Sequence, residues 1–180
     1  MDCHAAAAAS SQASDRNLPT EKNCLRCHDG RRAGRVETAP LPRLATARRE
    51  VRFNHKLHLG FGNIAPLLAA AIDGGKYLSE SAHIRKHLDT KEACAACHRG
   101  LPQTDYSSRA NLPQMADCLV CHSQIQPPFS CEKCHTAPAA SLKPATHAPE
   151  YLDAHSAMKL DKPSCRVCHG VQFTCMGCHN

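Results

Sequence analysis

Cys118-Leu119-Val120-Cys121-His122 is followed closely by Cys131-Glu132-Lys133-Cys134-His135. The same Cys-x-x-Cys-His pattern recurs at Cys24–His28, Cys94–His98, Cys165–His169 and Cys175–His179. These six copies use twelve of the thirteen cysteines. A random arrangement of this composition would give roughly 0.06 copies. The repeated motif is therefore not a chance feature, and the function of the chain is inferred from it.

The spacing of this motif suits covalent attachment of c-type haem. Two thiols three residues apart lie on one side of a turn and can add to the two vinyl groups of one haem. The following His then lies beneath the ring as the proximal iron ligand. We expect attachment through Cys24, Cys27, Cys94, Cys97, Cys118, Cys121, Cys131, Cys134, Cys165, Cys168, Cys175 and Cys178, with His28, His98, His122, His135, His169 and His179 as proximal ligands.

Two other kinds of cysteine chemistry fit the pattern less well. A disulfide framework gives no reason for an odd number of cysteines or for a His after each pair. Zinc sites use Cys-x-x-Cys pairs and His, but they combine such pairs two by two and do not require His directly after each pair.

The thirteenth cysteine, in Met1-Asp2-Cys3-His4, forms the second half of the same motif. One explanation is that Met1 is an internal methionine, so that the native chain extends upstream with an intact motif and an export signal. Another is a degenerate site that holds haem by one thioether. Both predict a seventh haem at Cys3 and His4. The remaining alternative is an odd cysteine beside a chance histidine.

Six histidines lie outside the motifs, and we expect them to be the sixth, distal iron ligands. Neutral imidazole commonly fills this position in low-potential multihaem proteins. His83 and His87 are four residues apart in a predicted helix over 79–88, so both lie on one face and could serve neighbouring haems. The complete set is His55, His58, His83, His87, His147 and His155.

Val51-x-Phe53-x-His55-x-x-His58 resembles the opening signature of the class III cytochromes, the cytochrome c3 and c7 group. The resemblance covers 49–180, although 59–93 separate the histidine pair from the next motif and the chain has more motifs than this family. It implies that two different haems are ligated by His55 and His58, and that the aromatic side chain packs against a ring. It further implies that His55 serves the haem at Cys94–His98.

The composition predicts a mostly irregular fold with short α-helices, little or no β-sheet and haem as its core. The chain has no Trp and only seven Phe and Tyr residues, and its mean hydropathy is −0.42. Large aromatic side chains, which normally fill a core, are therefore scarce. Haems would supply the missing apolar bulk, so the apo-protein should not fold.

Three segments are predicted along the chain. Residues 1–30 hold two haem sites, with Thr20 capping a short helix into Cys24. Residues 31–50 form a basic linker rich in Arg and Pro, and 51–180 form a class III-like body with five sites. In the body, the apolar run 64–72 is too short to span a bilayer. It would cover a haem or form a patch for a partner. Residues 136–150 are predicted to be a surface loop that brings His147 to its iron.

The basic charge does not predict binding of nucleic acid. The formal net charge is +6, but each ferric bis-His haem adds about −1 through its two propionates. Seven such haems would bring the protein to roughly −1, so the Arg and Lys residues are better explained as propionate partners. The linker could still present a basic patch to an acidic redox partner.

These features predict electron transfer by haems whose two axial positions are both filled by His, either in a discrete carrier or complex subunit or in a filament of identical chains. Covalent haem attachment in bacteria predicts a periplasmic or extracellular protein, joined to a membrane only through a partner or an upstream anchor. Because seven haems would face six distal histidines, an enzyme of the nitrite or hydroxylamine type with one open iron is the alternative. Met115, Met158 or an upstream His could instead fill that position.

Overall fold

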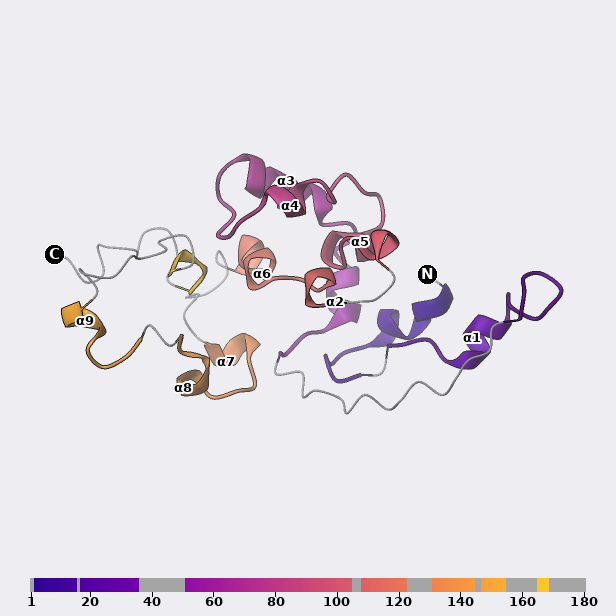
Figure 1. Ribbon diagram of the computed structural model, residues 1–180, viewed down its shortest axis with the longest axis horizontal. Helices are drawn as coiled ribbons and strands as arrows, with labels where there is room; N and C mark the ends of the chain where they lie inside the picture. The colour runs from indigo at the N-terminus through magenta and orange to yellow at the C-terminus, as the bar shows by residue number, and fades with distance from the viewer. Residues whose placement is uncertain are drawn as a thin grey trace. The chain divides into compact units, whose positions relative to one another are not determined.

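The computed structural model describes residues 2–15, 17–35, 51–104, 108–122, 131–144, 147–154 and 165–168 (Figure 1). Short helices joined by irregular segments make up these ranges. In chain order they are η1 (Asp2–Ala9), α1 (Glu21–Leu25), α2 (His55–Leu59), α3 (Ala65–Asp73), α4 (Ala82–Arg85), α5 (Ala93–Cys97), η2 (Leu101–Gln103), η3 (Arg109–Asn111), α6 (Met115–His122), α7 (Cys131–Cys134), α8 (Ala139–Leu142) and α9 (Tyr151–Ala154). Residues 165–168 are also helical.

The described ranges contain no β-sheet, as the composition predicts. Their β-structure is limited to an isolated antiparallel bridge between Val51 and His135. None of their helices has the length and apolar character needed to cross a membrane. The fold is therefore mostly irregular with short α-helices.

The chain divides into two compact units, the first formed by Met1–Phe61 with Lys133–Ala137, the second by Gly62–Glu132 with Pro138–Asn180. In the first unit, η1 contacts both α1 and α2. The buried residue Ser10 follows η1, and its carbonyl accepts a hydrogen bond from the Lys56 N–H at 2.9 Å. The Arg52 N–H donates to the carbonyl of Cys134 at 2.6 Å. These backbone contacts hold α2 against the N-terminal segment, and the residues before α2 against Cys134.

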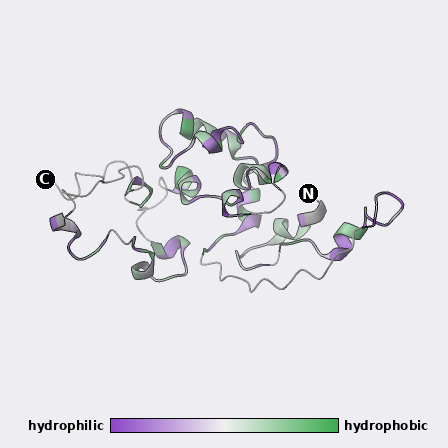
Figure 2. Ribbon diagram, in the orientation of Figure 1, coloured by the Kyte–Doolittle hydropathy of each residue, from purple (hydrophilic) through white to green (hydrophobic). Residues whose placement is uncertain are grey.

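The second unit has a small apolar core in which α3 packs against α5 and α6. This core consists of Ala65, Leu68, Tyr77, Ile84, Leu88, Ala96 and Ala116. Figure 2 shows hydrophobic residues along α3. Its Leu68 is 1% exposed, whereas Leu67 on the other side is 58% exposed. The apolar run 64–72 is thus helical and buries one face in the core, while apolar side chains such as Leu67 stay exposed on the other.

Glycine ends α3 in the left-handed conformation. Gly75 has φ +66°, and its N–H bonds the carbonyl of Ile72 at 3.0 Å. The Lys76 N–H bonds the carbonyl of Ala71 at 2.8 Å. This pair of bonds is the Schellman arrangement, which favours glycine because a Cβ is strained at positive φ. It turns the chain sharply, so that Tyr77 enters the core.

Two local predictions were wrong in extent. The predicted helix over 79–88 is limited to α4. Ser81 at its N-terminus makes no side-chain capping bond, and after Arg85 the N–H groups of His87 and Leu88 bond carbonyls three residues earlier, as in a turn. The predicted loop over 136–150 contains α8, which begins after the extended residue Pro138 and is supported by the Ser141 hydroxyl donating to the Pro138 carbonyl. The predicted boundaries at 30 and 50 stay predictions, since 36–50 lie outside the described residues.

Candidate functional site

The described cysteine pairs lie on short helical turns. Cys24 lies in α1, which begins after its N-cap residue Thr20. The side-chain oxygen of Asn23 in the first turn accepts hydrogen bonds from the N–H and the hydroxyl of Thr20, at 2.9 and 2.7 Å. This agrees with the predicted cap. The other pairs lie on α5, α6, α7 and 165–168. Residues three apart on a helix share one face, so each pair can present its two sulfur atoms together.

Most of the described motif thiols are accessible to solvent. No cysteine between Cys24 and Cys168 in the described ranges is in a disulfide bond. At least one member of each of these pairs is exposed. Burial raises the pKa of the Cys97 thiol, so this thiol is protonated over a wider pH range. The geometry is that of paired, accessible thiols.

The clearest feature of the site is how the histidine rings are oriented. Nδ1 of the proximal candidate His28 lies 2.9 Å from the carbonyl of Gly34. Nδ1 of His98 lies 3.2 Å from the carbonyl of Asn111. The same arrangement occurs at His4, with the carbonyl of Asn17 at 2.9 Å, and at His58, with the carbonyl of Asn54 at 2.8 Å.

These contacts fix the tautomer of each ring. A carbonyl oxygen only accepts, so Nδ1 must be the donor and a neutral imidazole then carries its lone pair on Nε2. Metal-ligating histidines commonly have this second-shell bond from the non-ligating nitrogen to a backbone carbonyl. The donor chemistry of these four residues therefore fits an iron bound through Nε2.

An aromatic side chain lies between the two histidines of α2, in the first unit. The Phe53 ring stacks on His58 at 4.3 Å between ring centroids and meets His55 edge-on at 4.8 Å. Nδ1 of His55 is 3.5 Å from the hydroxyl of Ser10. The segment Val51–His58 thus places both predicted distal ligands around one phenyl ring.

Asn54 is the N-cap of α2, and its replacement by Ala is expected to destabilise the protein by about 1 kcal/mol. Its side-chain oxygen accepts a hydrogen bond from the Leu57 N–H at 2.9 Å, whereas its backbone carbonyl, the partner of His58, survives the substitution. Chemical denaturation followed by circular dichroism measures the loss. Asn54→Asp keeps the acceptor and should lie within a few tenths of a kcal/mol of the wild type; an equal loss in both variants would show that capping is not the cause.

A buried ion pair joins two motifs in the second unit. Nη2 of Arg99, the residue after His98, is 2.6 Å from Oδ2 of Asp117, the residue before Cys118, and both side chains are 4% exposed. The Tyr77 hydroxyl donates to Oδ1 of Asp117 at 2.8 Å. Burial and the neighbouring Asp117 charge raise the pKa of Tyr77 above its ordinary value, so it remains a neutral donor.

The ion pair is completed by backbone contacts. Nη1 of Arg99 donates to the carbonyl of Ala96 at 3.0 Å, and the Gln114 N–H donates to Oδ2 of Asp117 at 2.7 Å. The side chain of Asn111 donates to the carbonyl of Arg99 at 2.8 Å, while its own carbonyl accepts from His98. Sequence analysis missed Arg99, Asn111 and Asp117 because each appears as an ordinary polar residue. The one available signal was that two of them directly flank motifs.

The other predicted distal ligands are spread over the second unit. His83 is exposed on α4, and His87 follows this helix. His147 stacks in parallel on Tyr151 at 5.5 Å between ring centroids. The predictions for the Cys3 side chain and for His155, His169, Cys175, Cys178, His179 and Met158 lie outside what the structure describes.

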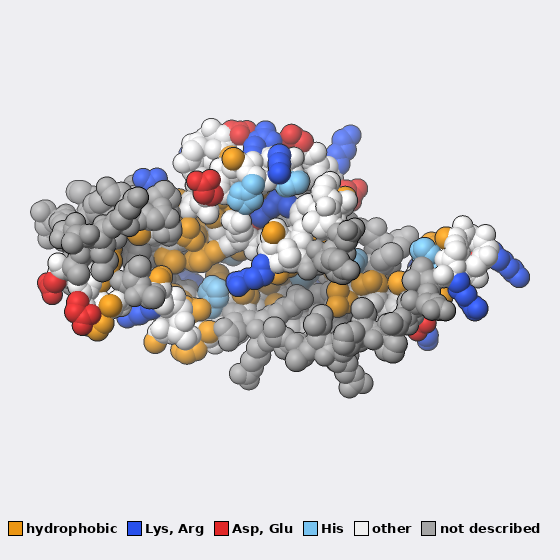
Figure 3. All heavy atoms as spheres, in the orientation of Figure 1, with side chains coloured by type: hydrophobic (Ala, Val, Ile, Leu, Met, Phe, Trp, Pro, Cys, Tyr) orange, Lys and Arg blue, Asp and Glu red, His pale blue; other side chains and the backbone are white. Residues whose placement is uncertain are grey.

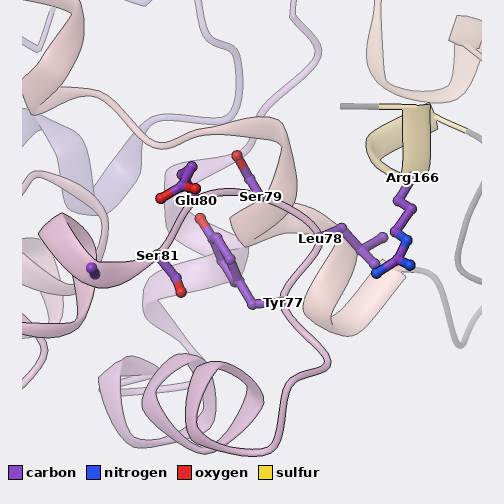
Figure 4. A pocket seen from close by; sticks show the side chains of 7 residues that line it. Tyr77, Leu78, Ser79, Glu80, Ser81 and Arg166 are labelled. Atoms are coloured by element: carbon purple, nitrogen blue, oxygen red, sulfur yellow. The ribbon is translucent and has the colours of Figure 1, made fainter. Parts of the chain in front are cut away.

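Two surface cavities have no cysteine in their lining, although Arg166 in the first belongs to the motif Cys165–His169. One of about 310 Å³ is lined by Tyr77–Ala82 and Arg166 (Figure 4). A second, of about 560 Å³, lies between α3 and 88–91. Within the described ranges, no group of three or more His, Cys, Asp or Glu side chains is arranged to hold a metal ion.

Comparison with known proteins gives this chain no relative: no family model, curated protein or solved structure matches it.

Proposed function

We propose that this chain is a multihaem c-type cytochrome that transfers electrons between partner proteins. The observation that carries the proposal is the pairing, in Cys24–His28 and Cys94–His98, of two thiols on one helical turn with a His whose Nδ1 bonds a backbone carbonyl. Haem bound there would supply an iron that accepts and releases one electron. The protein's own residues would attach the group, ligate its iron and exclude water from it.

Exposed apolar side chains support the same proposal. Phe61 is 70% exposed and Leu57 57% exposed, on or directly after α2. Figure 3 shows hydrophobic side chains scattered over the visible face. Attached haems would cover such residues and remove them from water. Axial positions filled by His on both sides give low potentials and leave no site for a substrate.

The partners would be redox proteins or further copies of this chain in a filament, and the compartment periplasmic or extracellular. His4 is oriented like His28 and His98, which supports a seventh haem at Cys3 and His4. Seven irons would then outnumber the six spare histidines, so an oxidoreductase with one open iron remains the second candidate.

Haem content and spin state test the proposal together. The protein made in a host that attaches c-type haem should carry six or seven haems per chain by the pyridine haemochrome assay. The electron paramagnetic resonance spectrum of the fully oxidised protein should show low-spin ferric haem throughout. A high-spin signal near one haem per chain would instead favour the oxidoreductase, and a protein without covalent haem would refute both functions.

Cys24→Ser/Cys27→Ser should remove one haem, whereas Ser14→Ala, an exposed control, should remove none.

A further inference from the structure

We infer that His83 and His87 are distal ligands of two different haems, His83 for the haem of Cys118–His122 and His87 for the haem of Cys94–His98. This inference rests on the proposed function. It differs from the pairing that the class III resemblance implies, in which His55 serves the Cys94–His98 haem.

One buried core contains Ile84 of α4, Leu88 after it, and residues of both helices that carry the motifs. Ile84 and Leu88 are 2% and 3% exposed and belong to the same buried cluster as Ala96 of α5 and Ala116 of α6. His83 and His87 directly precede these two anchors. His83 lies on α4, whereas His87 lies in the turn that follows it, where its N–H bonds the carbonyl of Ile84 at 2.9 Å. The anchors therefore hold two separated imidazoles beside two separate motifs.

His83 lies next to the motif on α6. Its Nε2 is 3.5 Å from the side-chain nitrogen of Gln114. The carbonyl of Gln114 is in turn 3.7 Å from the sulfur of Cys118. One residue thus contacts both His83 and the first cysteine of the motif at 118–122.

His87 lies next to the motif on α5. A Cβ atom built on Gly100 would be 3.8 Å from Nε2 of His87 and 3.7 Å from the side-chain nitrogen of Asn111. Asn111 is the residue whose carbonyl bonds His98. Gly100 has φ +68°, a conformation that favours glycine, and its Cβ position would be in ordinary contact with the His87 ring. His87 therefore lies beside Gly100, which is two residues after His98 in the sequence.

The test removes each histidine and asks which haem changes. In the oxidised holo-protein, His83→Ala and His87→Ala should each create a signal of one high-spin haem per chain. The His87→Ala signal should vanish when Cys94→Ser/Cys97→Ser removes the α5 haem, and persist when Cys118→Ser/Cys121→Ser removes the α6 haem. His83→Ala should show the reverse dependence, so the two histidines are matched controls for each other.

Other outcomes would overturn the assignment. The pairing is refuted if each high-spin signal vanishes with the other motif's haem, if it vanishes with neither haem, or if no high-spin signal appears while the haem content is intact. The proposal of electron transfer would stand in each case. A protein without covalent haem would refute both. If a double-cysteine variant fails to accumulate, His83→Met and His87→Met keep every haem attached. Proton NMR should then place the bound methionine methyl group of His83→Met beside the Cys118/Cys121 thioethers and that of His87→Met beside the Cys94/Cys97 thioethers; any other placement refutes the pairing.

Discussion

Without attached haem, the full chain should fail to fold cooperatively. In the described residues, four of the nine buried hydrophobic residues are alanines, and nine large hydrophobic side chains are exposed. Burial of a large apolar side chain contributes about 1.5–3 kcal/mol, whereas ordering the backbone of each residue costs about 1–2 kcal/mol. So few large buried side chains cannot order segments of this length, and covalently attached macrocycles would add the missing apolar contacts.

Expression with and without the haem-attachment machinery tests this expectation. The holo-protein should give a sigmoidal denaturation curve by far-ultraviolet circular dichroism, while the apo-chain should show a gradual change with no midpoint. Loss of one haem in Cys24→Ser/Cys27→Ser should weaken the transition without abolishing it. An apo-chain with the midpoint of the holo-protein would mean that haem is not the core.

The sequence alone was sufficient for features that depend on neighbouring residues. Thr20 was predicted to cap the helix into Cys24, and the structure confirms this cap through Asn23. The cap rests on a pattern of a few residues, where local geometry and local sequence are directly linked. The scarcity of large side chains, a property of the composition, agrees with the absence of a sheet in the described residues. The apolar run 64–72 was predicted to cover a haem or to form a patch for a partner, and the structure shows it as α3 with one face in the core of the second unit.

Features that join distant parts of the chain were not predictable in this way. Asp117 pairs with Arg99, eighteen residues earlier, and with Tyr77, forty residues earlier. Nothing in their local sequence distinguishes these residues from solvated ones. The orientation of His98 depends likewise on Asn111, thirteen residues later. The extent of a short helix such as α4 is set by its packing through Ile84 more than by helix propensity, so its boundaries were also misjudged.

Replacing Arg99 by Ala should destabilise the holo-protein by about 3–5 kcal/mol, because it leaves the buried carboxylate of Asp117 without its cation. The two side chains are 4% exposed, and their contact is 2.6 Å. The midpoint of chemical denaturation measures the loss. Arg85→Ala is the matched control: Arg85 also bonds two carboxylates, Asp73 and Asp89, but the three side chains are 34%, 58% and 82% exposed. Exposed pairs contribute about 0–1 kcal/mol, so this variant should lose little.

A second set of variants separates loss of the ion pair from loss of packing. Arg99→Met/Asp117→Leu/Tyr77→Phe removes the cation, the carboxylate and the hydroxyl that donates to it, so no charge is left buried and unpaired. Exchange of a whole buried ion pair for apolar residues of similar size is often neutral or stabilising, so this triple variant should recover most of the stability that Arg99→Ala loses. If the triple variant is as unstable as Arg99→Ala, the unpaired charge of Asp117 is not the cause of the loss. The hydrogen bonds and packing of Arg99 between the two motifs would then be the cause. Similar losses in Arg99→Ala and Arg85→Ala would refute the expectation that burial makes the Arg99–Asp117 pair the more important of the two.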